Sequence, residues 1–73
     1  MANHLTASMR VVRAHLRQRH VSVAVARDVI KRGAQLLAAG AAGPDTEDLA
    51  ARLQKATGCS MAELAEQAEG WPV

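Results

Sequence analysis

The sequence predicts an all-α fold, a small domain of four helices over about 5–19, 22–39, 46–57 and 60–69. Three observations predict it. Large apolar residues recur at steps of three and four, residues that commonly cap helices stand at segment starts, and glycine or proline separates the segments. Seventy-three residues are too few for two separate cores, so we expect one helical domain over 1–73.

The first helix is predicted over 5–19 because its apolar residues fall on one side. They follow one another at steps of four, three and four: Leu5, Met9, Val12 and Leu16. The opposite side carries a cationic stripe at similar steps: Arg10, Arg13, Arg17 and His20. Such a helix buries its apolar side and turns its charged side to solvent. Asn3 or Thr6 is the candidate cap at its start.

Residues 21–26 admit two interpretations. Three valines alternate there with small residues, which is typical of a short strand. However, the sequence holds no second convincing strand to pair with it, and an isolated strand is not stable. We therefore predict a helix over 22–39 that begins at a Ser22 cap, with Gly33 costing about 1 kcal/mol inside it. Its apolar side is wide, so we expect it to be the central helix or an oligomer interface.

A linker rich in glycine and alanine separates this helix from the third one. Gly40 suits the position just past a helix end, and Pro44 prevents the helix from continuing. Asp45 or Thr46 is the predicted cap of the third helix, over 46–57.

The fourth helix is predicted over 60–69 by a capping box. Ser60 is followed three residues later by Glu63, the spacing at which side chain and backbone cap each other reciprocally. Gly70 is expected to close this helix, and Trp71-Pro72-Val73 to form a short tail.

Charge divides sharply along the chain. Residues 1–43 hold seven Lys or Arg and one acid, a net charge of +6, whereas residues 44–73 form an acidic helical hairpin with a net charge of −4. This asymmetry is the most informative functional feature of the sequence.

No constellation of residues predicts catalysis, a metal site or a cofactor. Cys59 lies among carboxylates, which disfavour a reactive thiolate. His4, His15 and His20 are eleven and five residues apart, so no two lie one turn apart on a helix face as ligands spaced by four do. We therefore expect a protein that is not an enzyme.

The location predicted for the chain is the cytoplasm. A single cysteine forms no internal disulfide and fits a reducing compartment. Arginines stand where a signal peptide needs apolar residues, and no run of about 18 apolar residues predicts a membrane span. The alanine-, arginine- and valine-rich composition suits a bacterial source.

The basic half predicts contact with DNA or RNA. Helices 5–19 and 22–39 resemble a helix-turn-helix pair in spacing, although the turn lacks glycine. The expected phosphate- and base-contacting residues are Arg10, Arg13, Arg17, Arg27, Lys31 and Arg32. By contrast, the C-terminal pair exposes three glutamates, which phosphates repel.

Two other interpretations of the same basic residues remain open. They form a solvated face, or they meet an acidic protein surface on another protein or on a second copy of the chain. An aliphatic core of this size also favours self-association. We expect a homodimer that buries Val25, Val29 and Leu36.

The function predicted from these features is that of a small regulatory protein that contacts DNA or RNA, as in transcription regulation, and that acts as a dimer. The alternative is a protein-binding adaptor or inhibitor of bacterial or phage type, which uses the same charged face without nucleic acid.

Overall fold

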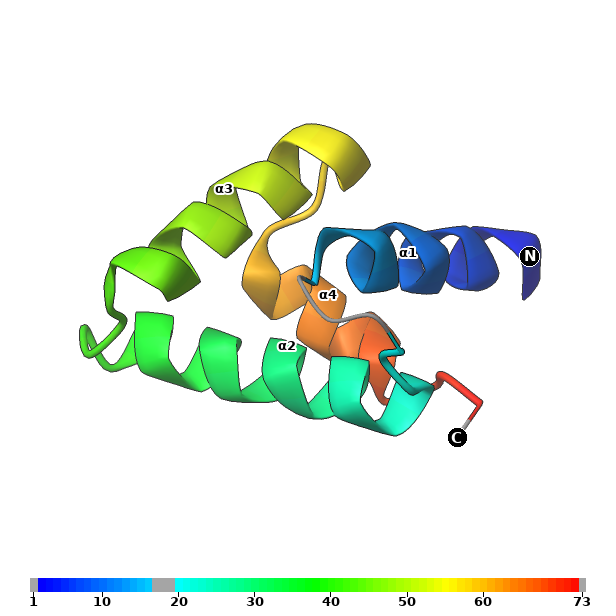
Figure 1. Cartoon of the computed structure of the whole chain (residues 1–73), viewed down its shortest axis with the longest axis horizontal. Coiled ribbons are helices and arrows are strands. Elements are labelled where there is room, and N and C mark those ends of the chain that lie inside the picture. The colour runs from blue at the N-terminus through cyan, green and yellow to red at the C-terminus, as the bar shows by residue number, and fades with distance from the viewer. Residues whose placement is uncertain (1, 17–19, 73) are drawn as a thin grey trace.

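The computed structural model describes residues 2–16 and 20–72, with side chains from residue 7 onward. It confirms an all-α fold of four helices, arranged as in Figure 1: α1 Ala2–His15, α2 Val23–Ala38, α3 Pro44–Thr57 and α4 Met61–Ala68. The helix predicted for the valine-rich segment is confirmed, and the described part of the chain contains no strand.

The start and end of α1 differ from the prediction. Asn3 and Thr6 lie inside the helix and do not cap it. The helix ends at His15, because the Leu16 amide donates to the Arg13 carbonyl oxygen at 3.3 Å and tightens the last turn. Residues 17–19 of the predicted helix lie outside the described residues.

The caps predicted around α2 are confirmed. The Ser22 hydroxyl accepts a hydrogen bond from the Val25 amide at 3.1 Å. At the other end, Gly40 adopts the left-handed conformation with φ of 69°. Its amide donates to Leu37 and the Ala41 amide donates to Leu36, which satisfies the last free carbonyls of the helix.

The cap predicted for α3 is wrong, whereas the box predicted for α4 is confirmed. Gly43 caps α3 and Pro44 occupies its first turn, because a proline there loses no intrahelical bond. At α4, the Glu63 amide donates to the Ser60 hydroxyl at 3.2 Å, and the Ser60 amide donates to the Glu63 carboxylate at 2.9 Å. The backbone hydrogen bond from Ser60, followed by the one with its hydroxyl, lowers the pKa of Glu63 below its ordinary 4.5.

The core lies where the four helices meet around α2, which contacts each of the others and packs most extensively on α4. Its buried apolar residues come from all four helices, from the segment before α2 and from the segment after α4: Val12, Val21, Ala26, Ile30, Leu53, Met61, Leu64, Ala68 and Trp71. The central position predicted for the second helix is thereby confirmed.

Trp71 corrects the prediction of a short tail. Trp71 is only 3% exposed, so its side chain packs into the core, whereas Pro72 beside it is exposed. Trp71 is the only Trp, Tyr or Phe in the chain. A single large ring fills space that small aliphatic residues leave open, since aromatic side chains bury the largest areas.

Gly33 also has a role that helix propensity alone does not reveal. It is buried, and a Cβ there would lie 3.0 Å from the Met61 methyl carbon and 3.6 Å from Thr46 Cγ2. A Cβ there would be in ordinary contact with Thr46, but the Met61 methyl would have to shift by a few tenths of an ångström to accommodate it.

Candidate functional site

The predicted basic residues of α1 lie on an exposed side of that helix. Arg10 and Arg13 are both exposed. The Arg13 Nε nevertheless donates a hydrogen bond to the Val21 carbonyl oxygen at 2.9 Å, just before α2. Arg13 thus ties the two N-terminal helices together. Arg17 lies outside the described residues.

The three predicted cations of α2 divide between two sides of the helix. Lys31 Nζ lies 2.7 Å from Glu69 Oε1, directly after α4. Arg32 is exposed and lines a hollow on the side of α2 that faces α3. At 100° per residue, Arg27 falls on the side of Lys31. The six residues predicted as one nucleic-acid-binding face therefore include a pair directed at the acidic half of the chain itself.

The electrostatics of Glu69 agree with that placement. The hydrogen bond from Lys31 and then the charge of Lys31 lower the pKa of Glu69 from its ordinary 4.5, and the charge of Arg27 lowers it further. Both cations thus act on a carboxylate of the acidic half. The charge asymmetry of the sequence is partly neutralised within the fold.

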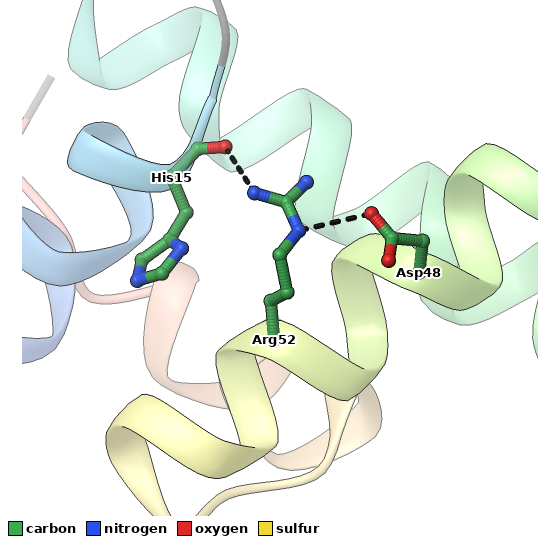
Figure 2. A network of polar contacts seen from close by, with 3 residues as sticks. All are labelled: His15, Asp48 and Arg52. Atoms are coloured by element: carbon green, nitrogen blue, oxygen red, sulfur yellow. Dashed lines mark hydrogen bonds and ion pairs between the residues drawn. The ribbon is translucent and has the colours of Figure 1, made fainter.

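A second contact joins the two halves at α3 (Figure 2). Arg52 Nη1 donates to the His15 carbonyl oxygen at 3.3 Å, and Arg52 Nε lies 3.0 Å from Asp48 Oδ2. His15 is the last residue of α1, where unsatisfied carbonyls carry partial negative charge. The Arg52 guanidinium therefore caps α1 and holds it against α3.

The predicted dimer residues lie on one side of α2 and are open to solvent to different degrees. Val25 is 42% exposed, and Val29 and Leu36 are half-buried. With Arg32 they follow one another at steps of four, three and four, so all four share one stripe. We call Val25, Val29, Arg32 and Leu36 the outward face of α2.

A hollow of about 210 Å³ adjoins this face. It lies between α2 and α3, with the Met61 side chain of α4, and is lined by Val29, Arg32, Gly33, Leu36, Thr46, Leu49 and Met61. Leu49 of α3 is half-buried here. The outward face thus combines an exposed valine with an apolar recess.

A second hollow, of about 360 Å³, lies between α2 and α4. Half of its lining residues are alanines, and Lys31 and Glu69, which form the ion pair described above, are also among them. The lining residues are Lys31, Ala34, Gln35, Ala38, Ala62, Ala65, Glu66 and Glu69. Small side chains on both helices explain how the backbones approach closely while leaving this space.

Cys59 occupies a structural position in the turn before α4. Its thiol is half-buried and packs against the core. The polar groups beside it are Gln67 Nε2 at 3.6 Å and the Thr57 carbonyl oxygen at 3.8 Å, neither of which is a base. Across residues 2–16 and 20–72, no three side chains of His, Cys, Asp or Glu gather where a metal ion could bind.

Sequence reasoning missed three residues that organise the site. Glu69 takes Lys31 out of the expected basic face, Arg52 links the two halves, and Leu49 lines the hollow beside α2. Glu69 and Lys31 are 38 residues apart in the sequence, so no local periodicity relates them. The excess of acidic residues over 44–73 is the signal in the sequence for an internal partner of the cations.

In the described part of the chain, no helix has both the length and the apolar character needed to cross a membrane. No protein-family model, no curated protein and no solved structure matches this chain. The function is therefore argued from the protein's own residues.

Proposed function

We propose that this protein acts by binding a protein partner through the outward face of α2, and that it catalyses no reaction. The observation that carries the proposal is the exposure of Val25, in line with Val29 and Leu36 and beside an apolar hollow. An exposed valine in line with two half-buried apolar residues, next to a recess, provides the desolvated centre on which protein interfaces depend.

Charge also favours a protein partner over a nucleic acid at this face. Lys31 is paired with Glu69, and the exposed carboxylate of Asp28 stands one turn before Arg32. Phosphate groups would meet that carboxylate as they approached the stripe. A protein surface offers both apolar groups and cations, and so accommodates Val25 and Asp28 together.

Photo-crosslinking in the cells that make the protein tests this proposal. A photoreactive benzoyl-phenylalanine is placed at position 25, in a tagged full-length chain. We expect one dominant protein adduct on irradiation, because a partner seated on the outward face of α2 lies within reach of that side chain. Mass spectrometry of the adduct identifies the partner chain and the contact residues.

The matched control carries the same photoreactive residue at position 51. Ala51 is exposed, and it lies on the side of α3 opposite Leu49. We expect this variant to give little of the same adduct. Equal labelling from both positions, or crosslinks from position 25 to nucleic acid alone, would contradict the proposal.

Nucleic-acid contact through α1 is the second candidate function. It is favoured by one observation, that Arg10 and Arg13 are both exposed on the same side of α1. These cations lie three residues apart, which suits contacts to a phosphate backbone. In this second candidate function, α1 and the residues that follow it supply the affinity for nucleic acid. Arg27 and Lys31 contribute little, because Glu69 competes with phosphate groups for them.

A further inference from the structure

We propose that the partner of the outward face of α2 is a second copy of this chain, packed antiparallel about a two-fold axis that passes between Ile30 and Lys31. The inference rests on the proposed function, that this face binds protein. It adds the identity of the partner, the direction of packing and the residue pairs that meet.

The spacing of the stripe predicts a helix partner. Steps of four, three and four over Val25, Val29, Arg32 and Leu36 are those of the seam along which two helices pack. The seam is also symmetric about its middle. When a second α2 runs in the opposite direction about that middle, Val25 of each chain faces the partner's Leu36.

The projecting and recessed parts of the face then match each other. Val25 projects near the start of α2, whereas the hollow runs along α2 from Val29, at its middle, to Leu36, near its end. Val25 and Leu36 are eleven residues apart, about 16 Å along the helix. A two-fold axis between them places each valine over the partner's hollow at the same time, as a self-complementary interface requires.

The charges at the edge of the seam select the antiparallel direction. Asp28 and Arg32 are both exposed and one turn apart, and Asp28 forms no ion pair within the described ranges. Reversing one helix brings Asp28 of each chain beside the partner's Arg32, which makes two symmetric pairs. A parallel pair in register would place the two Asp28 carboxylates side by side, and like charges across an interface are unfavourable.

A charge exchange tests the inference. Sedimentation velocity over a concentration series compares the wild-type chain with Asp28→Arg, with Arg32→Asp and with an equimolar mixture of the two variants. The wild-type chain is expected to dimerise. In a dimer of either variant alone, like charges face each other at both symmetric contacts. Because like charges across an interface are unfavourable, the dissociation constant of that dimer should rise by about 10-fold or more.

The mixture provides the decisive comparison. One variant carries cations at positions 28 and 32, and the other carries carboxylates at both positions. The antiparallel heterodimer therefore regains both ion pairs, and it should form at the protein concentrations at which the wild-type chain dimerises. Circular dichroism controls for folding, which we expect to be unchanged because Asp28 and Arg32 are exposed.

Two results would overturn the inference. One is a wild-type chain that stays monomeric throughout the series, and the other is a mixture that associates no better than its components. If the chain is monomeric while position 25 crosslinks to a different protein, the second-copy inference fails and the proposed protein-binding function stands.

Discussion

Replacing Trp71 with alanine is expected to destabilise the fold by about 3–5 kcal/mol, the range for removing a buried aromatic side chain. Trp71 is 3% exposed and is the only aromatic residue of the core. No neighbouring side chain of similar size can fill the space. Because domains of this size have small margins of stability, the variant should be largely unfolded at room temperature.

The matched variant Trp71→Phe separates the contribution of the ring's volume to stability from that of its N–H donor. The Trp71 Nε1–H is buried and has no hydrogen-bond acceptor among the described residues. Phenylalanine keeps most of the ring and removes this unpaired donor, so it should cost much less than alanine. Urea unfolding followed by circular dichroism measures both. Similar losses for the two variants would show that the ring does not fill the core as the structure places it.

The second large effect is expected at Leu53, whose replacement by alanine should cost about 2–5 kcal/mol. Leu53 is fully buried and is the one residue of α3 classed as buried. Leu49 and Ala50 of α3 also pack against the core, and Arg52 donates a long hydrogen bond to His15 (Figure 2). Loss of the leucine should therefore weaken the packing of α3 on the rest of the molecule.

Leu49→Ala is the matched control for that substitution. Leu49 is the same residue type one turn earlier in α3, but it is half-buried beside the open hollow. Its replacement should cost clearly less, since its environment already admits solvent. Denaturant unfolding at one low protein concentration compares the two. Equal losses would contradict the assignment of Leu53 to the core.

The elements that could be predicted from the sequence are those fixed by short-range chemistry. Ser22 and the Ser60–Glu63 pair cap their helices within three residues, so the sequence alone predicts their role. Gly40 ends α2 for an equally local reason, because only a left-handed residue completes the terminal hydrogen bonds. The choice of helix over strand for 21–26 rested on the lack of a pairing partner.

The elements that could not be predicted depend on contacts between distant segments. Nothing near Trp71 indicates that its side chain packs into the core. Likewise, Gly33 reads as a weakness until Met61 is known to lie against it. The end of α1 at His15 depends in part on Arg52, from another helix.

The candidate site shows the same division. The stripe of Val25, Val29 and Leu36 follows from helical periodicity, and the structure leaves Val25 exposed and the other two half-buried. The basic face could not be predicted in the same way, because the spacing of charged residues does not show which of them form ion pairs. The ion pair between Lys31 and Glu69 appears only when α2 packs on α4.

Light scattering coupled to gel filtration, at low and high salt and with and without duplex DNA, tests the central claim, that this protein acts through the outward face of α2 rather than by binding nucleic acid. The account predicts the mass of a dimer in all four conditions and no co-elution with DNA, because apolar burial persists when salt screens charge. A monomer that binds DNA at low salt would contradict it. The contradiction would be complete if log affinity fell with log salt at a slope of about −4 to −5, as four to six phosphate contacts require.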